Sequence, residues 1–163
     1  MKEILIAISL LSIKSGEQNE FLTKFQIQNQ WLGFDPAKNE TITETEKKLN
    51  IILPEDYKNF IKITNGFSAP NSVEPTFMKI EDIDYLKNIE KEAIDAYQIP
   101  ELENSILVAG KDEEQYFLLI PPKDKISKWK YWKFANWIPG KNEFENLEIY
   151  FKDVLDFCKN NTD

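Results

Sequence analysis

Carboxylates are the side chains of this chain that could do chemistry, because the commoner catalytic groups are missing. The sequence has no histidine, and all 20 of its basic residues are lysine. Without histidine it lacks the usual general base near neutral pH and the commonest metal ligand. The single cysteine, Cys158, can complete neither an internal disulfide nor a cysteine–histidine zinc site, and its position beside Phe157 favours a packed thiol over a nucleophile. We therefore predict no catalytic residue, no cofactor site and no metal site.

Two groups of neighbouring carboxylates keep a hydrolase open as the less favoured alternative. Asp82 with Asp84, or Asp112 with Glu113 and Glu114, could act as an acid–base pair or as metal ligands. Acidic residues that are adjacent in sequence on loops are more often simply solvated. These same carboxylates have a second interpretation, which depends on the distribution of charge.

The net charge of −8 comes from one stretch of the chain. Between residues 81 and 114 there are eleven acidic residues and three lysines, whereas the rest of the sequence has 17 residues of each sign. Charge alone favours a solvated acidic surface. Alternatively, the stretch produces a negative electrostatic field that attracts a basic protein partner. The contacts with that partner would then be made by Glu81, Asp82, Asp84, Asp112, Glu113 and Glu114. The negative charge and the absence of arginine argue against direct binding of nucleic acid.

The one basic patch spans residues 123–133 and carries five lysines among aromatic residues. Lysine interleaved with Trp129, Tyr131 and Trp132 has the composition of a surface that binds single-stranded nucleic acid. Residues 131–135 also alternate like a β-strand, and we favour an edge or outer strand with its lysines on the wet face. Trp129 and Trp137 are candidate exposed anchors for a partner.

The elements that must position these residues begin with a central helix over residues 53–66. Pro54 suits the first helical position, and Asn65-Gly66 supplies the positive φ that ends a helix. Tyr57, Phe60, Ile61 and Thr64 share one face of it, so we expect them in the core.

The N-terminal half is predicted to be helical. The apolar run at residues 4–13 is too short to cross a membrane and lacks a cleavage site, so we expect a helix docked on the domain. A second helix over residues 20–30 should turn Phe21, Leu22 and Phe25 inward. The pattern Thr43-x-x-Glu46 predicts a capping box that opens a third helix, with Ile42 and Leu49 buried.

The C-terminal half is predicted to hold the sheet. We expect strands at 76–80, 105–109, 115–120 and 131–135, helices at 81–87 and 89–97, and a closing helix at 146–159. Residues 105–120 read as a hairpin, and strands joined by short turns pair antiparallel. The predicted fold is α+β, a mainly antiparallel sheet packed against several helices, in a single domain 1–163 with residues 1–30 as an N-terminal helical extension.

Several motifs occur in an order that resembles the SUKH superfamily. They are WLGF at residues 31–34, LPEDYKNFI at 53–61, TNGF at 64–67, KYWKFANWIPG at 130–140 and NLEIYFKDVLDF at 146–157. That superfamily includes a fungal regulator of cell-wall synthesis and many bacterial immunity proteins. The resemblance covers roughly residues 31–157 and implies a SUKH-like fold.

The resemblance also implies a function without catalysis. It suggests a cytoplasmic immunity protein that neutralises a cognate bacterial toxin, often a nuclease, by direct association, with no membrane partner. A nuclease must be basic to hold phosphates, so the acidic stretch, with Trp129 as an anchor, would meet a basic toxin. The alternative within the same fold is a regulatory scaffold like the fungal relatives.

Overall fold

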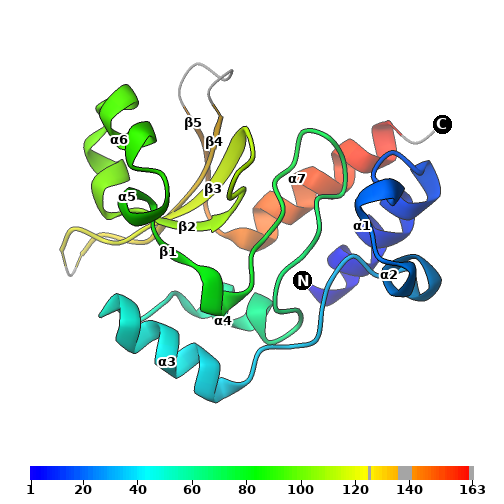
Figure 1. Ribbon diagram of the computed structural model, residues 1–163, viewed down its shortest axis with the longest axis horizontal. Coiled ribbons are helices and arrows are strands. Elements are labelled where there is room, and N and C mark those ends of the chain that lie inside the picture. Colours follow the sequence, from blue (N-terminus) through cyan, green and yellow to red (C-terminus); the bar gives the residue numbers. More distant parts are fainter. Residues whose placement is uncertain (125, 136–140, 162–163) are drawn as a thin grey trace.

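Helices lie against both faces of an antiparallel sheet in the computed structural model (Figure 1). The structure describes residues 1–124, 126–135 and 141–161, and within these the sheet has five strands in the order β1-β2-β3-β4-β5. Each strand is antiparallel to its neighbour. The strands are β1 Asp84–Tyr85, β2 Ile106–Ala109, β3 Gln115–Ile120, β4 Lys130–Ala135 and β5 Lys141–Phe144. The predicted α+β fold is confirmed.

The helices of the described chain fall before, within and after the sheet. The α-helices are α1 Lys2–Ser15, α2 Lys24–Asn29, α3 Asn39–Leu49, α4 Glu55–Ile61, α5 Leu86–Ile89, α6 Lys91–Tyr97 and α7 Leu147–Asn160. The 3-10 turns are η1 Asn19–Phe21, η2 Ile80–Asp82 and η3 Pro100–Asn104. Among the described residues, no helix is both long enough and apolar enough to cross a membrane.

Alternation along the strands divides the core into two parts, because successive side chains in a strand point to opposite faces. On one face, Ile106, Val108, Phe117, Leu119 and Tyr131 join the main cluster with residues of α1, α3, α4 and α7. On the other face, the intervening residues meet a smaller layer made by α5, α6 and η3; they are Leu107, Leu118, Ile120, Trp132 and Phe134. The sheet is thus the middle of three layers.

Aromatic rings form the centre of the main cluster. The ring centroid of Phe60 in α4 lies 5.2 Å from that of Phe77 and 5.3 Å from that of Phe151 in α7. Phe117 of β3 lies 4.5 Å from Tyr150. Such pairs contribute about 0.5–1.5 kcal/mol each beyond the area that they bury. They join α4, α7 and the sheet, and the prediction that Tyr57 and Phe60 belong to the core is confirmed.

The N-terminal helix is present and docks on the domain, where it packs on the last helix. Leu5 and Ile8 of α1 are fully buried in the main cluster, and α1 contacts α7. Gly16, with φ of 78°, ends α1 in the left-handed conformation that glycine adopts without strain.

The second helix differs from the prediction. A capping box between Thr23 and Gln26 starts α2 only at Lys24, so residues 20–30 form a 3-10 turn followed by six helical residues. The Gln26 amide takes the inward position and donates to Leu32 O at 2.8 Å. Phe21 and Phe25 are 73% and 68% exposed, so their predicted burial is wrong.

The third helix begins four residues before the predicted capping box. Thr43 lies inside α3 and its hydroxyl donates to Asn39 O at 3.0 Å. Glu46 accepts instead from Leu53 N at 2.9 Å, so it ties α3 to the chain that enters α4. Ile42 and Leu49 are buried as predicted.

The central helix is shorter than predicted at both ends. Pro54 precedes the first helical residue, with ψ of 144°, and α4 ends at Ile61. Beyond it, the Asn65 N–H pairs with Asp35 O at 3.1 Å, and the Thr64 hydroxyl accepts from Phe34 N at 2.8 Å. These contacts with distant backbone draw the chain out of the helix, and Gly66, with φ of 101°, serves the following turn.

The segment at residues 76–80 forms bridges rather than a strand. Phe77 pairs with both Phe67 and Ala109, and the chain then enters η2 at Ile80. The predicted helix at 81–87 is replaced by η2, β1 and the start of α5, and that at 89–97 is interrupted at Glu90. The hairpin of β2 and β3 and the closing helix α7 are confirmed.

Candidate functional site

The acidic stretch follows the edge of β2 that faces away from β3. Residues 76–78 pair with the C-terminal end of β2, through Gly110 N to Thr76 O at 3.0 Å and Met78 N to Val108 O at 2.9 Å. β1 pairs with the other end, where Asp84 lies opposite Leu107. Between the two pairings the chain leaves the edge as η2, which carries Glu81 and Asp82.

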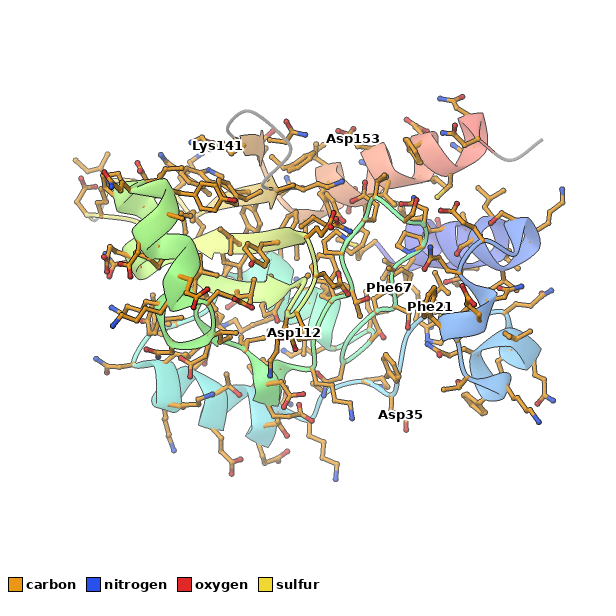
Figure 2. The ribbon with its side chains drawn as sticks, turned by 45° about the horizontal axis from the view of Figure 1, so that its top comes forward. Phe21, Asp35, Phe67, Asp112, Lys141 and Asp153 are labelled. Atoms are coloured by element: carbon orange, nitrogen blue, oxygen red, sulfur yellow. The ribbon has the colours of Figure 1, made fainter. Side chains whose placement is uncertain are left out.

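The second group of carboxylates lies on the hairpin turn that follows β2. Asp112 occupies this turn in a left-handed conformation, with φ of 62°, and is labelled in Figure 2. The structure therefore places Glu81, Asp82 and Asp84 along this edge of β2, and Asp112, Glu113 and Glu114 on the turn at its end. We call these six residues together the acidic edge. In the described residues no group of three or more histidine, cysteine, aspartate or glutamate side chains converges to hold a metal ion.

Three of the six carboxylates are engaged in the fold. Glu81 accepts from Asn65 Nδ2 at 2.8 Å, and Glu113 accepts from Thr76 N at 3.0 Å. Asp84 accepts from Asn88 Nδ2 at 2.9 Å and lies 3.5 Å from Lys48 Nζ. Burial raises the pKa of Asp84, but the hydrogen bonds from Asn88 and the Tyr85 N–H, with the charge of Lys48, outweigh it and leave the pKa below its usual value.

The other three carboxylates point to solvent. Asp82, Asp112 and Glu114 are exposed, and their side chains make no hydrogen bond or ion pair in the described part of the chain. An exposed carboxylate that the fold does not neutralise is available to a cationic partner.

The basic patch contains a buried charge. Lys133 is 7% exposed, and its Nζ lies 2.7 Å from Glu74 Oε1. The Tyr150 hydroxyl donates to the other oxygen of Glu74 at 2.8 Å. β4 lies between β3 and β5, so the interpretation of an edge strand with its lysines on the wet face is wrong at Lys133. No sequence signal identified Glu74, because it lies 59 residues before its partner.

The aromatic residues of that patch are mostly unavailable as a stacking surface. Trp132 is 1% exposed and donates to Glu143 Oε2 at 3.0 Å, and Tyr131 is buried. Trp129 is half-buried and packs against the main cluster. The other candidate anchor, Trp137, lies outside the described residues.

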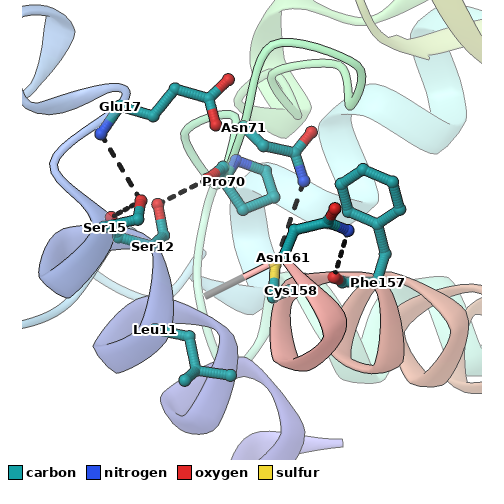
Figure 3. A pocket seen from close by; sticks show the side chains of 9 residues that line it. All are labelled: Leu11, Ser12, Ser15, Glu17, Pro70, Asn71, Phe157, Cys158 and Asn161. Atoms are coloured by element: carbon teal, nitrogen blue, oxygen red, sulfur yellow. Dashed lines mark hydrogen bonds between the residues drawn. The ribbon is translucent and has the colours of Figure 1, made fainter. Parts of the chain in front are cut away.

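A small cavity of about 30 Å³ lies beside Cys158, between α1, α7 and the loop at residues 70–71 (Figure 3). Asn71 Nδ2 donates to Cys158 Sγ at 3.9 Å, and the Ser12 hydroxyl donates to Pro70 O at 2.6 Å. Burial raises the pKa of the Cys158 thiol above its usual value. The thiolate is the reactive form of cysteine, so the predicted packed thiol is the better description.

Comparison of the sequence with known protein families and with curated proteins bears on the function of this site. The model of the SMI1 / KNR4 family (SUKH-1) matches residues 36–160. The matched region takes in the sheet, the acidic edge and α7, whereas α1 and α2 precede it. No curated protein matches the chain.

Proposed function

Because the chain belongs to the SMI1 / KNR4 family (SUKH-1), we propose that it is an immunity protein, which binds a cognate bacterial toxin and neutralises it by direct association. Family membership supports this proposal, since many bacterial members of the wider superfamily are immunity proteins. The proposal requires no catalysis by the chain itself and places its action in the cytoplasm.

One observation supports the mode of binding: the side chains of Asp82, Asp112 and Glu114, beside β2 and on the turn after it, are exposed and make no hydrogen bond or ion pair in the described chain. A toxin that acts on nucleic acid presents cations to phosphates, and carboxylates on a complementary surface can occupy that site. Complementary charge also speeds association and suppresses wrong partners. Glu81 and Glu113, which are hydrogen-bonded within the fold, add to the same negative electrostatic potential. Trp129 supplies aromatic surface for contact with the partner.

We also propose that residues 1–163 form one domain, with 1–30 as an N-terminal extension of the family fold. The burial of Leu5 and Ile8 in the main cluster supports this, because removal of α1 would expose that part of the core. The matched family region starts at residue 36, after the proposed extension.

The experiment is capture of the partner at low and high salt from a lysate of the source cells. We expect the immobilised chain to retain a basic protein that high salt releases. Co-expression of the chain with that protein should then protect cells that the protein alone kills. If the unchanged chain retains nothing, or if the retained protein is harmless to cells, the immunity proposal fails.

A charge variant and a matched control test the mode of binding. The triple variant Asp82→Asn, Asp112→Asn, Glu114→Gln removes three charges from the acidic edge. The control Glu3→Gln, Glu44→Gln, Asp153→Asn removes three from exposed positions elsewhere, so that both proteins have the same net charge.

At about 0.2–1 kcal/mol for each of three exposed pairs, the edge variant should bind about 3-fold to about 150-fold more weakly than the control. Equal affinity of the two variants, or a complex indifferent to salt, would show that binding does not depend on this edge.

A further inference from the structure

The outer face of α1 is apolar, although this helix lies at the surface of the protein, beside α7 (Figure 1). The inner face packs on the main cluster through the fully buried Leu5 and Ile8. On the side away from them, Ile6 and Leu10 are 40% and 44% exposed. Residues 4–13 hold no charged side chain. A helix that is apolar on all sides is normally covered on all sides.

The helix α3 shows the pattern that α1 lacks. Its inward face buries Ile42, Thr45 and Leu49. Its exposed side chains are all polar or charged, namely Asn39, Glu40, Thr43, Glu44, Lys47 and Lys48. By comparison, α1 leaves aliphatic side chains in contact with water, and exposed apolar surface of this kind is typical of an interaction site.

Two charges of opposite sign flank the apolar face of α1. Glu3 and Lys14 are about three turns apart, so they lie on the same side of the helix near its two ends. Both are exposed, and neither side chain has a hydrogen bond or an ion pair within the residues that the structure describes. About 16.5 Å of helix separates them, so they cannot pair with each other in one chain.

Two-fold symmetry would pair these charges between two copies of the chain. In an antiparallel pair of helices related by a two-fold axis, residues at equal distances from the two ends face each other. With the axis midway between Glu3 and Lys14, Glu3 of each copy faces Lys14 of the other. Ile6 then lies next to the position that faces Leu10. A parallel pair would instead bring both copies of Lys14 to the same end.

The distribution of charge also favours α1 as the place where two copies meet. Residues 1–16 contain two lysines and one glutamate, a net charge of +1, whereas the rest of the chain carries a net charge of −9. Two acidic chains repel each other unless they meet at surfaces without excess negative charge.

We propose that α1 is a dimerisation helix, which packs antiparallel on α1 of a second copy of this chain, with Ile6 against Leu10 and Glu3 beside Lys14. The face of α1 is about 21 Å long and about 10 Å wide, which is about a quarter of the area that an ordinary interface covers on each partner. We therefore expect a weak dimer, which dissociates at about 1 μM and adds nothing there to the measured stability of the fold. Self-association is independent of the proposed immunity function, because it uses α1 and not the acidic edge.

A charge swap tests both the partner and the direction of the two helices. Glu3→Lys and Lys14→Glu each replace attraction by repulsion in both charge pairs of the dimer, so each should raise its Kd at least about fourfold. The two changes shift the net charge in opposite directions, so a general effect of charge cannot weaken both. The double variant restores both pairs and should dimerise as the unchanged chain does. An equal mixture of the two single variants should form a heterodimer, because each pair again joins opposite charges.

A second variant tests the apolar contact. Leu10→Asp should raise the Kd at least about tenfold, because it removes an aliphatic side chain from each half of the interface. The control Ile52→Asp makes the same change at a site outside α1 that is 74% exposed, and should leave the Kd unchanged. All variants are first checked for an unchanged melting temperature at about 1 μM, and dimerisation is measured by sedimentation equilibrium from about 1 μM to about 1 mM.

Three results would overturn the proposal. The first is an unchanged chain that stays monomeric up to about 1 mM. The second is a dimer that Leu10→Asp or the single charge reversals leave intact, since such a dimer uses another face. The third is a monomeric chain that binds vesicles of neutral phospholipid and loses this binding with Leu10→Asp, which would assign the apolar face to a membrane. Heterodimers in the mixture of reversed variants, with neither variant dimerising alone, are the expected result.

Discussion

The substitution Lys133→Met tests whether the buried ion pair under β4 holds the fold together. The side chains of Lys133 and Glu74 are each 9% exposed, and the Tyr150 hydroxyl is the other hydrogen-bond donor to Glu74. Methionine keeps most of the length of the lysine stem and removes its charge. The Glu74 carboxylate would then remain buried with one neutral donor, and loss of one partner from a buried pair costs about 3–5 kcal/mol.

A double-mutant cycle isolates the interaction. Glu74→Gln alone leaves the Lys133 ammonium buried without its counter-charge, whereas the double variant has neither charge and can keep an acceptor for Tyr150. We therefore expect the double variant to be less destabilised than the sum of the single variants, by about 0.5–3 kcal/mol.

The assay is urea denaturation followed by the fluorescence of the four tryptophans, together with thermal melting. For a chain of this size, about 2–4 °C per kcal/mol makes the expected loss about 6–20 °C in melting temperature. The control is Lys152→Met, which breaks a surface pair with Glu148 at 2.8 Å and should cost under about 1 kcal/mol. A loss for Lys133→Met no larger than that of the control, or strictly additive single variants, would refute this account.

Two further predictions concern alkaline pH and the N-terminal helix. Burial, helped by nearby carboxylates, raises the pKa of Tyr57, Tyr131 and Tyr150 well above the usual value. The unfolded chain releases these protons near pH 10 while the folded chain keeps them, so stability should fall as pH rises above about 10, by up to about 1.4 kcal/mol per pH unit for each group. Tyrosine absorbance and near-ultraviolet circular dichroism should then change together, and ionisation of all six tyrosines in a folded protein would contradict this. Ile8→Ala should lower the free energy of unfolding, measured by urea denaturation, by about 2–5 kcal/mol because Ile8 is fully buried. The control Ile6→Ala, at a site 40% exposed, should lower it by under about 1 kcal/mol. Equal losses for the two variants would count against α1 as part of the domain.

The sequence predicted best the elements whose signals are local. The helix α7 has apolar residues at three- and four-residue steps and an asparagine cap, and the β2–β3 hairpin is two apolar runs around a glycine-containing turn. Both are present within a residue or two of the predicted bounds, as is α1. Each of these signals lies inside the element that it predicts, so distant contacts change little.

Elements defined by distant backbone contacts were predicted less well. The chain leaves α4 early because Asn65 pairs with Asp35, 30 residues before it. The segment at 76–80 has the composition of a strand, but at Ile80 its N–H pairs with Asn65 Oδ1 at 2.8 Å and the chain turns into η2. Phe21 and Phe25 have the spacing of an inward face, yet Gln26 is the buried residue, and its Nε2 donates to Ser68 Oγ at 3.0 Å, 42 residues away. In each case a side chain or carbonyl far away in sequence decides the outcome.

The same limit applies to the candidate site. Composition places the acidic residues in one stretch, but it cannot distinguish Glu113 from Glu114. The Glu113 carboxylate accepts a hydrogen bond from Thr76 N, whereas that of Glu114 is exposed and makes no hydrogen bond or ion pair in the described chain. Nor can composition show that a lysine within a basic patch is buried on a glutamate 59 residues away.

This distinction gives a way to separate charges that serve the fold from charges that serve a partner. Neutralising Glu74 or Glu113 removes a hydrogen bond inside the protein and should lower stability whatever the partner is. Neutralising Asp82 or Glu114 removes no internal contact in the described chain, and relief of repulsion among like charges should leave stability unchanged or slightly higher. Carboxylates that add nothing to stability serve either solubility or binding, and only a role in binding makes their neutralisation lower the affinity for the partner. Comparing loss of stability with loss of affinity, one carboxylate at a time, therefore tests the immunity proposal at the level of single residues.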